Sequence, residues 1–135
     1  MKKCPCGSQR HYKNCCQPIH RSPEAAKVPA QLMRARYSAY VLGLVDFIVA
    51  TYHPSCQAEN DRQEIEQGTQ THWTKLAVLG AEDGHHTDEG FVSFKAYFEQ
   101  NGESYSLQER SRFIRENGRW YYIDGEFTDN DSSFM

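Results

Sequence analysis

The chain has 135 residues and a net charge of −3, with 39% hydrophobic and 24% charged residues. This composition is typical of a globular domain and excludes an intrinsically disordered chain. The longest apolar stretch, from Val41 to Tyr52, is too short to cross a bilayer and contains Asp46, so we expect no membrane span.

No apolar run follows Met1-Lys2-Lys3. We therefore expect no signal peptide, and a cytoplasmic protein whose thiols stay reduced.

Charge is distributed unevenly along the chain. Before Glu24 there are no acidic residues and five basic ones, namely Lys2, Lys3, Arg10, Lys13 and Arg21. The remainder is therefore more acidic than the net charge suggests. A basic arm on an acidic body is suited to binding an acidic protein or, more weakly, nucleic acid. The alternative is that these side chains only keep a small segment in solution.

The beginning of the chain is rich in cysteine. Four thiols fall within thirteen residues, at Cys4, Cys6, Cys15 and Cys16. Zinc favours four soft ligands in a tetrahedron, and so short a segment needs a bound metal to fold. Cys-x-Cys and vicinal pairs have poor geometry for disulfides, and a redox-active Cys-x-Cys would leave the second pair without a role. We therefore predict one structural zinc ion in a closed site, for which the substitute ligands are His11 and His20.

The neighbours of these cysteines have conformational roles. Pro5 and Gly7 suit a tight turn between the two cysteine pairs. Ser8 is expected to cap a short helical turn that runs to Cys15, and Tyr12 is expected to pack against this turn.

The rest of the chain begins with helices. Residues 1–20 are assigned to a zinc knuckle and residues 21–28 to a proline-containing linker. Pro29 opens a helix that Gly43 ends or bends, and a second helix stops before Pro54. Apolar residues recur at three-and-four spacing in both helices, at Leu32, Met33, Tyr37, Tyr40, Val41, Leu44, Phe47, Ile48 and Tyr52.

From His72 onward the hydrophobic period changes to two, which indicates strands. Strands are expected over residues 73–78, 91–100, 105–115 and 119–124, with hairpin turns at Asn101-Gly102 and Asn117-Gly118. Residues 57–70 are a loop or a short surface helix, and residues 129–135 a frayed tail. Helices followed by a four-stranded antiparallel meander define an α+β fold.

The motif Cys4-Pro5-Cys6-Gly7-Ser8, Tyr12, Cys15-Cys16 resembles the SEC-C motif, the zinc-binding tail of the preprotein translocase ATPase SecA. This resemblance implies that the knuckle holds zinc and docks onto an acidic chaperone surface or the ribosome. Cys16 stands where the translocase version usually has His, a common variant that preserves zinc binding.

Four further segments resemble the YchJ family of uncharacterised bacterial proteins. They are Leu32-Met33-Arg34-Ala35-Arg36-Tyr37-Ser38-Ala39-Tyr40, Tyr52-His53-Pro54-Ser55, Glu109-Arg110-Ser111-Arg112-Phe113 and Gly118-Arg119-Trp120-Tyr121-Tyr122-Ile123-Asp124-Gly125. With the knuckle, the resemblance covers nearly the whole chain. It implies a nuclear transport factor 2-like, cystatin-like domain over residues 29–128, in which a curved antiparallel sheet wraps around helices to form a cone. Members of the family often carry a second SEC-C motif at the C-terminus, which this sequence does not contain.

Cone-shaped folds of this kind commonly enclose a pocket. The candidates for its lining are Arg34, Arg36, His72, Trp73, Glu109, Arg112, Tyr122 and Asp124. Of these, Asp124 is expected instead to form a turn with Gly125.

Glu109 is the weak candidate for a catalytic residue, because it shares a strand face with Leu107 and Phe113. A carboxylate there is either paired or has a shifted pKa, in which case it would serve as a general base. The preferred interpretation is a buried ion pair with Arg34 or Arg36. No motif in the sequence pairs a base with a nucleophile or an oxyanion donor. An enzyme is therefore the less favoured functional class.

Three smaller features have two interpretations each. Cys56 near His53 is a reactive thiol or merely a small side chain. Gly84-His85-His86 is a metal site or a solvated loop tip. Trp120-Tyr121-Tyr122 stacks nucleic-acid bases or, on an alternating strand, lies half in the core and half at the rim.

Three functional hypotheses follow. The leading one is a non-enzymatic adaptor whose basic knuckle docks onto a protein partner. The second is a small-molecule-binding protein or enzyme that uses the interior of the cone. The third and weakest is contact with RNA or the ribosome through the basic arm.

Overall fold

The computed structural model describes residues 2–84 and 86–127. The predicted tail at residues 129–135 lies outside the described residues, as does the predicted domain end at residue 128. The helices are α1 (Cys16–Arg21), α2 (Pro29–Leu42), α3 (Val45–Thr51) and α4 (Arg62–Thr69), and the strands are β1 (His72–Asp83), β2 (Glu89–Gln100), β3 (Glu103–Glu116) and β4 (Arg119–Phe127). Short 3-10 turns are η1 (Tyr12–Asn14), η2 (Pro23–Ala25), η3 (Pro54–Cys56) and η4 (Ala58–Asp61).

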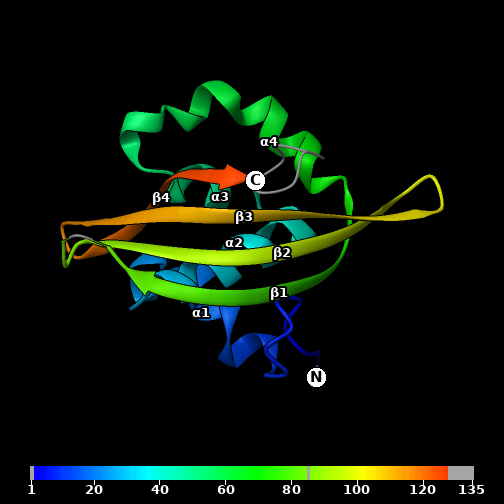
Figure 1. Cartoon of the computed structure of the whole chain (residues 1–135), viewed down its shortest axis with the longest axis horizontal. Helices are drawn as coiled ribbons and strands as arrows, with labels where there is room; N and C mark the ends of the chain where they lie inside the picture. Colours follow the sequence, from blue (N-terminus) through cyan, green and yellow to red (C-terminus); the bar gives the residue numbers. More distant parts are fainter. Residues whose placement is uncertain (1, 85, 128–135) are drawn as a thin grey trace.

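The four strands form one antiparallel sheet in the order β1-β2-β3-β4, a curved layer that covers helix α2 (Figure 1). The predicted α+β meander is confirmed. Asn101-Gly102 and Asn117-Gly118 form two-residue hairpin turns with positive φ at all four residues. This is the conformation for which Asn-Gly pairs are selected, because it matches the twist of the strands.

Helix α2 lies at the centre of the molecule. It contacts helices α1, α3 and α4 as well as strands β1, β2 and β4. The side chains of eight of its residues are buried, namely Leu32, Met33, Ala35, Arg36, Tyr37, Ser38, Ala39 and Tyr40. The helix starts at Pro29 and ends at Gly43, whose φ of 75° suits a left-handed C-cap. Both boundaries agree with the sequence prediction.

Different segments cover the two edges of the sheet (Figure 1). At the β4 edge, the His53 N–H donates to the carbonyl of Tyr122 at 2.8 Å. At the β1 edge lies the knuckle, where an added Cβ on Gly7 would be 3.4 Å from the carbonyl oxygen of Leu76. Strand β1 is also interrupted by register shifts after Trp73 and Val78. Such bulges disfavour the pairing of a further strand.

Several elements differ from the sequence prediction in extent. All four strands are longer than expected, and β1 extends to Asp83 because its second half, apart from Leu79, pairs with β2. The segment left open as loop or helix contains η4 and α4, and Ile65 and Gly68 of α4 are buried. Residues 21–28 contain η2 and the buried Ala26. Cys4, Cys6 and Cys16 belong to the same hydrophobic core as the body.

No helix in the described part of the chain is both long and apolar enough to cross a membrane.

We expect Gly118→Ala to destabilise the protein by about 1–2 kcal/mol, because a Cβ is disfavoured at positive φ. Gly118 has a φ of 75°, and an added Cβ there would meet nothing within 4 Å. The cost is therefore one of backbone conformation alone. Urea unfolding measures this loss in the free energy of unfolding. The matched control is Gly80→Ala, which also has open space but no positive φ. Equal effects of the two substitutions would contradict the prediction.

Candidate functional sites

The four predicted cysteines converge at one point. Their sulfur atoms all lie within 4.8 Å of one another. The Sγ atoms of Cys6 and Cys15 are 3.7 Å apart, and those of Cys15 and Cys16 are 4.0 Å apart. Four sulfurs at about 2.3 Å from one tetrahedral metal ion are about 3.8 Å apart, whereas a disulfide would need about 2.0 Å. The donor set fits a single metal ion with all four positions filled by the protein.

A small hairpin and the start of α1 bring the two pairs together. The Cys4 N–H donates to the carbonyl of Arg10 at 2.8 Å, and the positive φ of Gly7, 81°, turns the chain between the pairs. Cys15 and Cys16 lie at the beginning of α1. The predicted cap by Ser8 is wrong: η1 begins after His11 without a side-chain cap, and the Ser8 hydroxyl lies 3.2 Å from the Cys15 sulfur.

Thiols packed this closely perturb one another. Burial raises the pKa of Cys15. Hydrogen bonding to Cys4 and Cys6 raises the pKa of Cys16, while hydrogen bonds from Cys16 and Cys4 lower that of Cys6. The cluster thus favours partial ionisation, and a bound cation would be needed to stabilise four thiolates together.

Two side chains of α2 complete the surroundings of the cluster, and the sequence analysis assigned neither to it. The Ser38 hydroxyl lies 3.5 Å from the Cys4 sulfur and donates to the Cys16 sulfur at 3.4 Å. Arg34 donates to the carbonyl of Cys6 at 2.9 Å and to its sulfur at 3.7 Å. Arg34 was expected in the cone or paired with Glu109. It instead places its guanidinium beside the carbonyl and the sulfur of Cys6.

Neither histidine of the knuckle is a ligand. His11 is exposed and forms a backbone bridge with Lys3. The His20 ring lies between the Tyr12 hydroxyl, 2.6 Å from Nδ1, and the Ala35 carbonyl, 2.7 Å from Nε2. Burial lowers the pKa of His20. Tyr12 and His20 therefore join the knuckle to α2.

In the cone, Glu109 is fully buried. Its Oε2 accepts hydrogen bonds from Ser111 at 2.7 Å and from the Tyr122 hydroxyl at 2.8 Å, while Oε1 has no hydrogen-bond partner. Burial raises the pKa of Glu109, although both hydrogen bonds oppose the shift. Gly125 packs so closely that an added Cβ would overlap the carboxylate. The carboxylate is thus enclosed by the strands around it.

The expected ion pair of Glu109 with Arg34 or Arg36 is wrong, because no salt bridge among the described residues includes Glu109. Arg36 instead donates from Nη1 to the Ile48 carbonyl at 3.1 Å and to the Thr51 hydroxyl at 2.7 Å. Its guanidinium lies over the rings of Tyr52 and Tyr122, 4.4 and 4.6 Å from their centroids. Two aromatic faces, a carbonyl oxygen and a hydroxyl contact this buried cation, and its charge partly offsets the rise in the pKa of Glu109.

The interior of the cone is almost filled. A cavity of about 10 Å³ lies against Arg36 and the strands, lined by Met33, Arg36, Phe94, Ser111, Phe113 and Tyr122. That volume suits about one water molecule. This cavity therefore offers no room for an organic substrate and does not support the hypothesis of an enzyme or carrier that uses the cone.

The remaining pocket candidates do not meet in the cone. His72 is exposed and lies 3.5 Å from Glu99. Trp73 is buried and donates from its indole to the Gly68 carbonyl at 3.0 Å. Arg112 pairs with Asp124 at 2.7 Å. Asp124 also lies within strand β4, so the prediction that it forms a turn with Gly125 is wrong. Of the eight candidates, Arg36, Glu109 and Tyr122 lie together in the interior of the cone, whereas Arg112 and Asp124 form a separate, more exposed pair.

The smaller features are resolved in part. The Cys56 thiol donates to the Ile123 carbonyl at 3.3 Å, and burial raises its pKa, which disfavours a reactive thiolate. Trp120 and Tyr122 are buried while Tyr121 is half-buried, so the interpretation of this run as half core and half rim is confirmed. His86 is exposed, and His85 lies outside the described residues.

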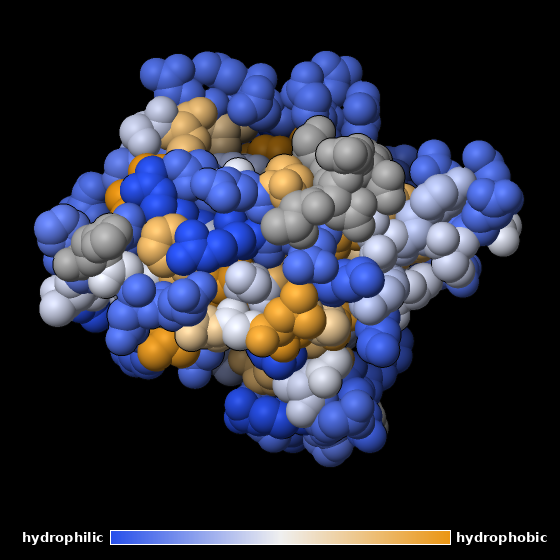
Figure 2. All heavy atoms as spheres, in the orientation of Figure 1, coloured by the Kyte–Doolittle hydropathy of each residue, from blue (hydrophilic) through white to orange (hydrophobic). Residues whose placement is uncertain are grey.

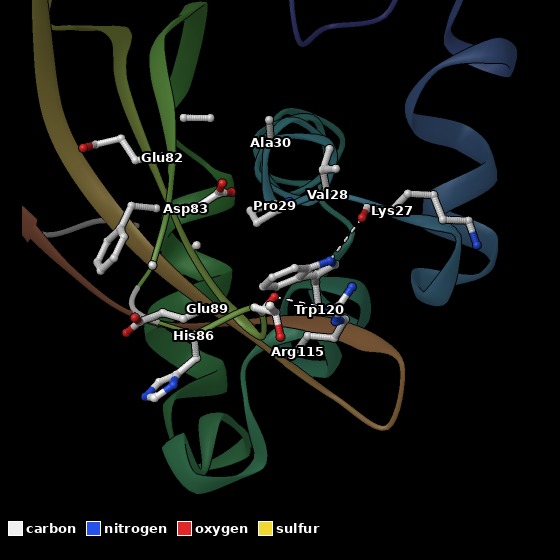
Figure 3. Close-up of a pocket in the computed structure, with 15 residues that line it drawn as sticks. Lys27, Val28, Pro29, Ala30, Glu82, Asp83, His86, Glu89, Arg115 and Trp120 are labelled. Carbon is white, nitrogen blue, oxygen red and sulfur yellow. Dashed lines mark hydrogen bonds between the residues drawn. The ribbon is translucent and has the colours of Figure 1, made fainter.

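A larger hollow of about 710 Å³ lies outside the cone, between the start of α2 and the β1–β2 turn (Figure 3). The Trp120 indole, which donates to the Lys27 carbonyl at 3.2 Å, forms one wall beside Pro29. Asp83 points toward Pro29, and Lys27 points away from the hollow (Figure 3). Arg115 is bound to Asp88 at 2.9 Å. This hollow combines the aromatic wall of Trp120 with the charged side chains of Asp83, Glu89 and Arg115.

Fold and cysteine site together define an NTF2-like domain that carries a SEC-C motif. The family model described as "YchJ, middle NTF2-like domain" matches residues 28–125, and the SEC-C motif matches residues 2–18. The chain belongs to the YchJ family.

Relatives and solved structures agree with this assignment. A UPF0225 protein of Vibrio parahaemolyticus is 56% identical over 129 residues, which are 96% of this chain and 77% of the relative. One of Enterobacter is 46% identical, over 96% of this chain and 88% of its own. The solution structure of a SEC-C motif containing protein from Rhodopseudomonas palustris has a TM-score of 0.84 at 36% identity and covers 93% of this chain and 98% of its own.

We expect the pH dependence of stability to change in Glu109→Gln. The folded state holds the proton above the usual carboxyl pKa of 4.5. The contribution of Glu109 is therefore fully present below that value and is lost as pH rises through the raised folded pKa. The slope is at most about 1.4 kcal/mol per pH unit. The stability of the glutamine variant relative to the wild type should accordingly increase from pH 5 upward.

Urea unfolding across this pH range checks the expected increase, with the exposed Glu126→Gln as control. Parallel curves would contradict it.

We also expect a strong chelator to lower the thermal unfolding midpoint of the whole chain, because the cysteines belong to the core of the body. Fluorescence of Trp73 and Trp120 reports on the body alone. One equivalent of metal should restore the midpoint. An unchanged tryptophan transition after the metal is removed would mean that the knuckle unfolds independently.

Proposed function

We propose that this protein is a non-enzymatic adaptor in which a zinc-stabilised basic knuckle docks onto an acidic surface of another protein. Zinc is the metal that four thiolates in a tetrahedron favour, and a site with no open position serves structure rather than catalysis. Arg34 and Ser38, which contact the sulfurs, are partners of the kind that orient metal ligands.

The observation that carries the docking role is the state of the basic side chains. Lys2, Lys3, Arg10, Lys13 and Arg21 are all exposed. Within residues 2–84 and 86–127, none of the five forms a salt bridge. By contrast, Arg110, Arg112 and Arg115 of the sheet are each paired with a carboxylate. Among the described residues, no carboxylate thus pairs with the basic side chains of the knuckle.

The position of the knuckle supports the same proposal. In Figure 2 it forms a predominantly hydrophilic projection from the body. It is also held rigidly, since Tyr12, His20 and Arg34 bind it to α2. A rigid charged projection loses little conformational entropy when it binds. The resemblance of the motif to the tail of the translocase ATPase implies an acidic protein as partner, and the cytoplasmic location predicted from the sequence is consistent with it.

Affinity capture from bacterial cytosolic extract tests the proposal, with zinc content measured on each form. The intact chain should carry one zinc ion and retain a partner. Cys15→Ser with Cys16→Ser should lose both. The combined variant Lys2→Glu, Lys3→Glu and Lys13→Glu should keep zinc and lose the partner, because only the charge is reversed.

The matched control reverses two lysines of the sheet, Lys75→Glu and Lys95→Glu, which lie over the Tyr97 ring. Capture should survive this change. Retention of the partner after reversal of the knuckle charges would contradict the docking role. Loss of the partner after nuclease treatment would favour the RNA or ribosome alternative instead.

A further inference from the structure

The face of helix α2 that turns toward the cysteines carries two polar side chains, those of Arg34 and Ser38. They are four residues apart, and residues at this spacing lie one above the other on a helix. Ser38 is fully buried and Arg34 is half-buried. Arg34 donates to the sulfur of Cys6, and Ser38 donates to that of Cys16. The metal centre thus combines sulfurs from the knuckle with hydrogen-bond donors from the body.

The Ser38 hydroxyl lies between the two cysteine pairs. Its oxygen is 3.5 Å from the sulfur of Cys4, in the first pair, and 3.4 Å from that of Cys16, in the second. A serine hydroxyl has one proton to donate, and Ser38 donates it to Cys16. One side chain of α2 therefore contacts a sulfur from each pair and helps to keep the two pairs at their mutual distance.

Filling of space does not by itself explain a serine at this position. Burial of a hydroxyl costs free energy unless it is hydrogen-bonded, and alanine would have no such cost. Serine inside a helix often bonds to the carbonyl four residues earlier. Among the described residues, however, the hydrogen-bond partners of the Ser38 hydroxyl are the two sulfurs. The polar group of Ser38 is thus used at the cysteines.

Arg34 contacts the cluster through a single nitrogen. Its Nη1 donates to the carbonyl of Cys6 at 2.9 Å and to the sulfur of the same residue at 3.7 Å. This double contact restrains both the backbone and the side chain of Cys6, next to the turn at Gly7. Within residues 2–84 and 86–127 Arg34 forms no salt bridge, so no carboxylate competes for its guanidinium.

We infer that helix α2 determines how tightly the knuckle holds its metal, with Ser38 and Arg34 as the positioning residues. This inference rests on the proposed zinc binding and adds to it a dependence on the body of the protein. Groups that hydrogen-bond to metal ligands orient them, and their removal commonly lowers metal affinity by about ten- to a hundredfold. The four cysteines supply the ligands, and α2 supplies the order that gives them full affinity.

The experiment measures the metal affinity of the full chain by competition with a chromogenic chelator, with zinc and cobalt(II) as probes. Ser38→Ala should lower the affinity for both ions about tenfold. A thiolate that loses a hydrogen bond donates charge to the metal more readily. The sulfur-to-cobalt charge-transfer band of the variant should therefore move to lower energy. The matched control, Ser111→Ala, removes a buried hydroxyl that donates to Glu109 in the cone and should change neither property.

Arg34→Met is a second test, at a position that is not fully buried. Methionine keeps the apolar stem and removes the donor, so the metal affinity should again fall about tenfold. Its control is Arg119→Met, which removes a half-buried arginine that donates to the Ala50 carbonyl at 2.7 Å. Tryptophan fluorescence of each metal-loaded form verifies that the variant is folded. If Ser38→Ala does not fold, Arg34→Met decides the result.

Two outcomes overturn this inference and leave the proposed function intact. One is wild-type affinity in both Ser38→Ala and Arg34→Met, since the cysteines would then hold the metal without help from α2. The other is an equal loss in these variants and their controls, since the effect would then be one of general stability. A wild-type chain that takes up no zinc would overturn both proposals. The docking role is tested separately, by capture with the knuckle lysines reversed.

Discussion

The burial of helix α2 on both sides is the constraint on which the other features depend. Residues four apart on a helix share a face, whereas residues two apart differ by about 200° in direction. Arg34 and Ser38 accordingly point toward the cysteines, while Arg36 and Tyr40 point into the cone. One helix therefore supplies both the surroundings of the metal centre and the polar groups of the interior. A change in its register would disturb the two sites together.

This arrangement gives the two parts of the molecule different characters. The cone, which in this fold class commonly holds a ligand, is here occupied by its own side chains, with Arg36 between two tyrosine rings and Glu109 bonded to Ser111 and Tyr122. The knuckle, by contrast, directs its cysteines inward and its cations outward. The polar groups buried in the body are thus bonded to one another, whereas the exposed charges of the knuckle support the proposed docking role.

Features that depend on neighbouring residues were predictable from the sequence. The four cysteines follow from spacing and the coordination of zinc, the hairpins from Asn-Gly pairs, and the limits of α2 from Pro29 and Gly43. Features that depend on distant residues were not. Ser38 lies 34 residues from Cys4, with which it is in contact, and nothing local marks it as a neighbour of the metal centre. The ion pair expected for Glu109 failed for the same reason, because strand pairing offers Tyr122 and Ser111 as closer partners.

The shared core has a consequence for the order in which the chain is made. During synthesis the cysteines leave the ribosome first, while the residues that bury them, Arg34, Ser38 and Leu76 among them, follow later. Under the proposed zinc binding, the metal would meet an open segment before the sheet exists. Its loss after folding would in turn weaken the core that Cys4, Cys6 and Cys16 share with the body.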